Sequence, residues 1–384
     1  MMAVTSSVGP GASNLLTGAA TAYVNRLPVL LLPGDVFMHR ASAPVLQEVE
    51  RPEDGTVNVN DCFKPVSAYF DRLTKPEQLI TALPRAIRTL TDAASCGPAT
   101  LCLPQDVQAE SFHYPTAFFD EVDHYPLRAG ADPEQLQRAA ALMQSARRPV
   151  VVAGGGLHYA DALDEFIRFV ERHNIPVVET SAGKGALGYS HKLNAGGIGV
   201  VGSSAANAII ADADLIITIG TRLSDFVTGS RTVMSNLRVP QVNINVALID
   251  AWKHGGLGLQ SDARRALVEL EPLLTGWSSE AAHLEKLAAV KQQWLDAVAS
   301  AVEPPRNTLP SDAQVTEVLN QVADHQRDVL VVAAGSMPAE GMKLWRNEHA
   351  LGYHSEYGFS CMGYEIPGGT VSYTHLTLPT TPYV

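Results

Sequence analysis

The sequence predicts an α/β protein made of three doubly wound parallel-sheet domains, the first and the third incomplete. Short, continuously apolar runs bounded by Gly, Pro or Asp recur along the chain, and stretches with helical periodicity lie between them. Strands that alternate with helices of this length form parallel sheets covered by helices on both faces.

Strands are expected where an apolar run is too short for a helix and ends at a turn residue. In chain order these runs are residues 3–6, 27–33, 99–103, 149–153, 175–179, 214–219, 241–246 and 328–333. Helices are expected after the first strand and over residues 133–146, 160–173, 279–301 and 311–325.

Two of these helices have clear start signals. Pro133 fits a first helical position with Asp132 as the N-cap, because the N–H that proline lacks would be unsatisfied there anyway. Ser311 fits the N-cap position of its own helix.

Segments without periodicity mark the domain boundaries. Residues 111–132 lose the helical pattern, and residues 302–310 are rich in proline. The last fifteen residues are rich in Thr and Pro, carry no formal charge and are expected to be a foreign tail on a fragment. The predicted divisions are 1–127, 128–301, 302–369 and the tail 370–384.

Charge and composition argue against several classes of protein. With 28 Lys and Arg against 40 Asp and Glu, the net charge is −12, and no strongly basic stretch could neutralise phosphates or an anionic membrane. No apolar run approaches the roughly 18 residues of a membrane span. The four cysteines form no C-x-x-C pair, so buried, reduced thiols in a cytoplasmic protein are expected.

The first candidate ligand-binding motif is the Gly-Pro-Gly turn within residues 7–14 (SVGPGASN), between a strand and a helix. Glycines let the backbone approach a ligand closely, and the free N–H groups of the helix face it. An ordinary tight strand-to-helix turn has the same spacing, and that alternative stays open.

Two further glycine motifs resemble dinucleotide loops. Gly154-Gly155-Gly156 follows a strand but lacks the third glycine of G-x-G-x-x-G. Residues 183–188 (GKGALG) satisfy the pattern, yet the residues that follow are Gly-rich and polar, so we expect no helix N-terminus to face a pyrophosphate. Neither motif predicts a nucleotide site.

The third candidate is a pair of turns, residues 333–338 (AAGSMP) and residues 357–365 (YGFSCMGYE). Exposed N–H groups without an obstructing Cβ are what phosphate binding requires, although generic strand-to-helix turns offer the same. Asp35 and His39 follow another strand, and for them solvation in a loop is expected. No histidine or cysteine spacing indicates a transition-metal site.

The order of these motifs resembles the thiamine diphosphate enzymes of the acetolactate synthase type. Residues 5–35 (TSSVGPGASNLLTGAATAYVNRLPVLLLPGD) resemble the pyrimidine-binding domain, residues 133–275 the central domain, and residues 328–369 the opening of the diphosphate-binding domain. The strings LLLPGD, VNDCFKPVSAYFDRLTKPEQL, TLCLPQDVQ and EYGFSCMGYE are most similar to the hydrolases that open a cyclic 1,2-dione in inositol catabolism.

This resemblance implies thiamine diphosphate and Mg²⁺ as cofactors, and a C–C bond hydrolase that converts a trihydroxycyclohexane-1,2-dione to 5-deoxy-glucuronate. It further implies a homodimer or homotetramer of the full-length form. Met362 matches the bulky apolar residue beneath the bent cofactor, with plain core packing as the alternative. The other matching positions are Gly335, Ser336 and Met337 on the first diphosphate-side turn, Gly358, Ser360 and Cys361 beside the cofactor, and Pro10, Gly11 and Asn14 on the pyrimidine-side loop of the partner subunit.

Two expected parts of the family pattern have no match here. The glutamate that activates the pyrimidine lies upstream of the first strand, and the Gly-Asp-Gly…Asn motif that binds Mg²⁺ lies beyond residue 369. We therefore expect no catalytic residue, no metal ligand and no activity in this chain alone. The alternatives are a carboligase with FAD in its central domain and a non-catalytic nucleotide-binding module on residues 133–275.

Overall fold

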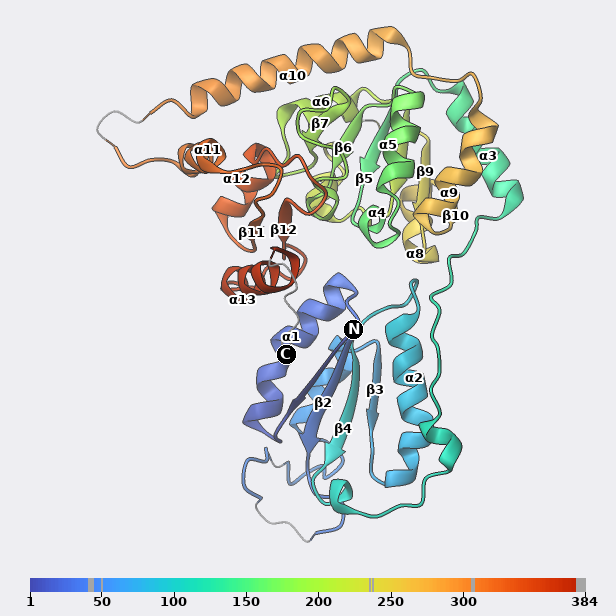
Figure 1. Ribbon diagram of the computed structural model, residues 1–384, viewed down its shortest axis with the longest axis vertical. Coiled ribbons are helices and arrows are strands. Elements are labelled where there is room, and N and C mark those ends of the chain that lie inside the picture. Colours follow the sequence, from blue (N-terminus) through green and yellow to red (C-terminus); the bar gives the residue numbers. More distant parts are fainter. Residues whose placement is uncertain (41–44, 50, 235, 237, 305–307, 378–384) are drawn as a thin grey trace. The chain divides into compact units, whose positions relative to one another are not determined.

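The computed structural model describes residues 1–40, 45–49, 51–234, 236, 238–304 and 308–377. They form two compact units, Met1–Leu127 and Arg128–Val384 (Figure 1). Within the described residues the strands form parallel sheets of four, six and two strands, with helices in the connections. This confirms the predicted α/β class.

The first unit is a four-stranded sheet with helices on both faces. Its strands are β1 (Met2–Ser6), β2 (Val29–Asp35), β3 (Tyr69–Arg72) and β4 (Ala99–Pro104), in the order β1-β2-β4-β3. Leu31 packs with α1 (Pro10–Asn25) and the 3₁₀ turn Val59–Val66 on one face. Leu30 and Leu32 pack with α2 (Leu79–Thr91) on the other, because successive strand residues point to opposite faces.

The second unit contains a six-stranded sheet in the order β10-β9-β8-β5-β6-β7. Its strands are β5 (Pro149–Ala153), β6 (Val177–Glu179), β7 (Asn194–Gly197), β8 (Leu215–Ile219), β9 (Gln241–Asn245) and β10 (Leu257–Gln260). One face is covered by α3 (Pro133–Ser145), α5 (Leu163–Arg172) and α9 (Ala263–Leu270), and the other by α6 (Ser204–Ala211) and α10 (Ala281–Ala301). The order reverses between β5 and β8.

The same unit continues into a small two-stranded sheet. After α11 (Asp312–Val322), the chain forms β11 (Leu330–Val332), α12 (Ser336–Leu344), β12 (Tyr353–Ser355) and α13 (Glu365–Val371). The strands β11 and β12 are parallel, with Val332 opposite Ser355. Short helices α4 (Gly156–Tyr159), α7 (Asp225–Thr228) and α8 (Leu248–Ala251) complete the unit.

The predicted strands and helices are present, with ends shifted by a few residues. Asp132 caps α3 by accepting from the amides of Glu134 and Gln135, and Ser311 caps α11, as predicted. The sequence did not predict β3, β7, β10 or β12, because these short strands lack a continuous apolar run. The division into three domains stays a prediction.

The described cysteines form no disulfide with one another. Cys102 is buried and Cys96 and Cys361 are half-buried, but Cys62 is exposed, so the expectation of buried thiols is wrong for Cys62. Cys102 lies in β4, where burial raises the pKa of its thiol. No helix in the described part of the chain is long and apolar enough to cross a bilayer.

Candidate functional site

The small sheet of the second unit brings the predicted diphosphate-side residues together. Since β11 and β12 are parallel neighbours, the turns that follow them emerge at the same edge of the sheet. Gly335, Ser336 and Met337 follow β11, and residues 358–362 follow β12. Sequence positions more than 20 residues apart therefore lie at one edge.

The first of these turns leaves a helix start open. Gly335 is the residue before α12 and has a φ of 97°, a backbone conformation that favours glycine. A Cβ added there would meet nothing within 4 Å. Gly335 and Ser336 are exposed, so the first amides of α12 are accessible to an anion.

The second turn is folded around a buried acid. Glu356, only 4% exposed, directly follows β12, and its carboxylate accepts hydrogen bonds from the amides of Phe359 (2.9 Å) and Cys361 (2.7 Å). Its own amide donates to the carbonyl of Val332 in β11 (3.1 Å). Glu356 thus ties the loop after β12 to both strands.

This loop presents the side chain that the sequence places beneath the cofactor. Met362 is 90% exposed, so the alternative that it packs in the core of this chain is wrong. Ser360, with a φ of 61°, and Gly363, with a φ of 86°, bend the backbone on either side of Cys361 and Met362. Gly358 and Ser360 are exposed, and Cys361 is half-buried.

The pyrimidine-side residues lie in the first unit, at the start of α1. Pro10 is the first residue of α1, Gly11 is the second, and Asn14 is exposed on the next turn. Gly9 precedes the helix with a φ of 69°. A Cβ added at Gly34, in β2, would lie 2.9 Å from the amide nitrogen of Val8, so this glycine lets the turn pack closely on β2.

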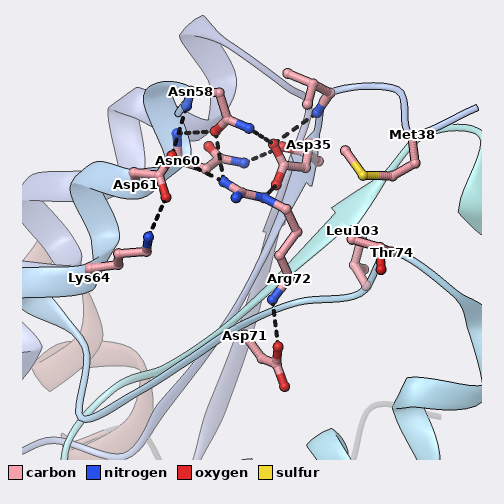
Figure 2. A network of polar contacts seen from close by, with 12 residues as sticks. Asp35, Met38, Asn58, Asn60, Asp61, Lys64, Asp71, Arg72, Thr74 and Leu103 are labelled. Atoms are coloured by element: carbon pink, nitrogen blue, oxygen red, sulfur yellow. Dashed lines mark hydrogen bonds and ion pairs between the residues drawn. The ribbon is translucent and has the colours of Figure 1, made fainter. Parts of the chain in front are cut away.

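Next to this turn, the carboxyl ends of β2 and β3 hold a buried ion pair (Figure 2). The carboxylate of Asp35 is 1% exposed and accepts from Nε of Arg72 at 2.6 Å and from the side-chain amide of Asn58 at 3.0 Å. The expectation that Asp35 is solvated in a loop is therefore wrong. His39 is exposed and pairs with Glu110 at 3.0 Å.

Arg72 connects this carboxylate to the 3₁₀ turn that follows Asn58. Its Nη2 donates to Oδ1 of Asn58 at 3.0 Å and lies 3.4 Å from Oδ2 of Asp61, as Figure 2 shows. Burial opposes the charge of Arg72, but the hydrogen bond and the charge of Asp35 leave its pKa raised. Asn60 donates to the carbonyl of Gly34 at 2.9 Å and completes the network.

The glycine motifs of the six-stranded sheet serve packing. The amide of Gly156 donates to the carbonyl of Gly220 at 2.9 Å, and a Cβ on Gly156 would lie 2.5 Å from Cα of Gly220. The turns after β5 and β8 are thus in backbone contact at the point where the strand order reverses. Residues 183–188 lead to turns and then to β7, so the prediction that no helix follows them is confirmed.

Sequence reasoning missed three residues that shape these sites. Arg72, Asn58 and Glu356 were not singled out, although Arg72 and Glu356 lie in strings that carried the resemblance and Asn58 directly precedes one of them. The available signal was their position, because Arg72 ends β3 and Glu356 directly follows β12. The described residues contain no group of three or more His, Cys, Asp or Glu side chains that could hold a metal ion.

Comparisons with known proteins show which proteins the chain is similar to. Residues 136–270 match the family described as "Thiamine pyrophosphate enzyme, central domain". The chain is 40% identical to proteins from Halalkalibacterium halodurans, Bacillus thuringiensis and Listeria monocytogenes, each named 3D-(3,5/4)-trihydroxycyclohexane-1,2-dione hydrolase. These alignments cover 95%, 96% and 95% of this chain and 61% of each relative, so the chain spans about three fifths of the relatives' length.

We predict that Arg72→Met destabilises the first unit by about 3–5 kcal/mol, because it leaves the carboxylate of Asp35 buried without its cation. Asp35→Asn combined with Arg72→Met should recover part of this loss. Urea unfolding measures the loss of stability, and hydrogen exchange of the backbone amides in β2 and β4 shows whether it falls in the first unit. The exposed Arg88→Met on α2 is the control and should change stability by no more than about 0.5 kcal/mol. If the Arg72 and Arg88 variants are equally stable, the ion pair of Asp35 and Arg72 does not stabilise the first unit.

Proposed function

We propose that this chain belongs to the thiamine pyrophosphate enzyme family and is the cofactor-binding part of a hydrolase that opens a cyclic 1,2-dione. The proposed substrate is a trihydroxycyclohexane-1,2-dione and the product is 5-deoxy-glucuronate. The relatives' printed names support the substrate class. We also propose a cytoplasmic location, where cysteine thiols stay reduced, and the described cysteines form no disulfide with one another.

The observation that carries the proposal is the pair of open turns after β11 and β12. Diphosphate groups bind where backbone amides point outward without an obstructing Cβ. Gly335 and Gly363 have positive φ angles and open space at the Cβ position, and the residues between Gly358 and Met362 are largely exposed. The residues present therefore fit the diphosphate end of the cofactor.

Thiamine diphosphate, when bound, supplies the electron sink needed for cleavage of a C–C bond next to a carbonyl. The residues of this chain bind and orient it. The amides of Ser336 and Met337 would hold the diphosphate, and Glu356 would fix the loop beside it. Met362 would support the cofactor from below with its exposed apolar side chain.

The pyrimidine end would be held by Pro10, Gly11 and Asn14 of a partner subunit, which makes a homodimer or homotetramer part of the proposal. A site shared in this way needs each subunit to supply one turn to its neighbour. The ion pair of Asp35 and Arg72 would hold the Gly-Pro-Gly turn against β2. The pair and the turn lie at the same edge of the four-stranded sheet.

Magnesium is the second cofactor that the resemblance implies, and its ligands are a separate question from those of the diphosphate. Mg²⁺ takes near-octahedral oxygen ligands, one or two of them carboxylates. The described residues present no cluster of acidic side chains at the two turns, and they do not fit a magnesium site on their own.

We predict that Gly335→Ala weakens thiamine diphosphate binding by about tenfold or more, since an anion-to-amide hydrogen bond is worth about 1.5–3 kcal/mol. The added Cβ points into open space and strains a positive φ. Isothermal titration of the chain with thiamine diphosphate measures the loss, and unphosphorylated thiamine is the ligand control.

Gly276→Ala is the matched variant, because Gly276 also has a positive φ (83°) and open space at Cβ but lies before α10. It should suffer the same backbone strain and bind the cofactor normally. The proposal fails if Gly335→Ala binds as well as the unchanged chain, or if both variants lose affinity equally.

A further inference from the structure

Residues 183–190 form one of the contacts between the six-stranded sheet and the small sheet within the second unit. The amide of Tyr189 donates to the carbonyl of Asn347 at 3.0 Å, and the amide of Ser190 donates to Glu348 at 3.0 Å. A Cβ on Gly185, whose φ is 93°, would lie 2.8 Å from Nδ2 of Asn347. Gly185 and Gly188 of this G-x-G-x-x-G string therefore serve close packing against residues 347–350, whereas Gly183 packs against Ala153 at the end of β5.

A buried acid folds this segment. Glu179 ends β6, and its Oε1 accepts from the amides of Gly185 (3.0 Å) and Leu187 (3.2 Å). Burial raises the pKa of Glu179, and the charge of Lys184 opposes that rise. Lys184 lies at the centre of the folded segment.

The ammonium of Lys184 faces the small sheet. The side chain is 4% exposed, and Nζ lies 5.7 Å from the ring centroid of Tyr353 in β12. This is the geometry of a cation–π contact, which strengthens when water is excluded. Burial lowers the pKa of Lys184, and the nearby charge of Glu179 opposes that shift.

Tyr353 contacts the first half of the candidate diphosphate site and lies in the strand that leads into the second half. It is 8% exposed and pairs with Leu330 across the small sheet. Its hydroxyl donates to the carbonyl of Pro338 at 3.4 Å, in the first turn of α12. Glu356 follows three residues later in the chain, and its carboxylate accepts a hydrogen bond from the second turn. The position of the Tyr353 ring therefore affects both turns.

We propose that Lys184 is a positioning residue that, through the ring of Tyr353, sets the spacing between the turn at Gly335 and the loop at residues 357–362. Core packing alone would be served by an apolar side chain at position 184, because burying a charge costs free energy. This inference rests on the proposed function only for the identity of the ligand, while the positioning itself is a property of the free chain.

Lys184→Met keeps the aliphatic length and removes the charge. In the chain without cofactor, we expect the amides of Phe359 and Cys361, both hydrogen-bonded to Glu356, to exchange with deuterium about tenfold faster. The amides of Val151 and Ile216, in the six-stranded sheet, should change by about twofold at most. Lys192→Met, at an exposed lysine of the same connection, is the control and should leave all four amides unchanged.

Two further variants keep the test decisive if Lys184→Met folds poorly. Glu179→Gln with Lys184→Met leaves no unpaired buried charge, so stability should return while Phe359 and Cys361 still exchange fast. Tyr353→Leu keeps an apolar side chain and should also speed the hydrogen exchange of the amides of Phe359 and Cys361. The proposal is wrong if Phe359 and Cys361 stay as protected as in Lys192→Met, or if Val151 and Ile216 accelerate equally.

Cofactor titration separates this inference from the proposed function. Lys184→Met should lower thiamine diphosphate affinity about tenfold relative to Lys192→Met, by an effect of the size of one desolvated cation–π contact. If the unchanged chain fails to bind the cofactor while Lys184→Met still loosens both turns, the ligand assignment fails and the positioning role stands. If the chain binds but the two lysine variants behave alike, the positioning role fails.

Discussion

The parallel pairing of β11 with β12 is the constraint on which the site depends. It brings the helix start at Ser336 and the loop at residues 357–362 to one edge, although an entire helix separates them in the chain. With only three residues in each strand, backbone pairing alone gives little rigidity. The edge is therefore held by side chains, chiefly Glu356 and Tyr353.

Buried acids repeat this role at the ends of other strands. Asp35 at the end of β2, Glu179 at the end of β6 and Glu356 directly after β12 each accept backbone or side-chain N–H groups from a neighbouring loop. A buried carboxylate is costly unless several donors satisfy it, so each acid ties its loop to one geometry. The sheets thus supply fixed edges, and the acids decide how the loops leave them.

The sequence predicted the α/β class and the continuously apolar strands well, since runs such as residues 149–153 and 214–219 are apolar throughout and too short for a helix. It could not predict β7 or β12, whose residues follow no apolar pattern. Placement of Gly335 and Met362 on accessible turns followed from the order of motifs. The pairing of Asp35 with Arg72, and of Lys184 with Tyr353, depends on contacts between distant segments that no local pattern encodes.

We propose that the cofactor binds at the edge of the small sheet and not at the turns that follow β5 and β8. A hydrogen-exchange footprint of the unchanged chain with and without thiamine diphosphate tests it directly. The account predicts slower exchange at residues 336–337 and 357–362 when the cofactor is present. Protection confined to residues 154–156 and 220–223, or no protection anywhere at saturating cofactor, would contradict it.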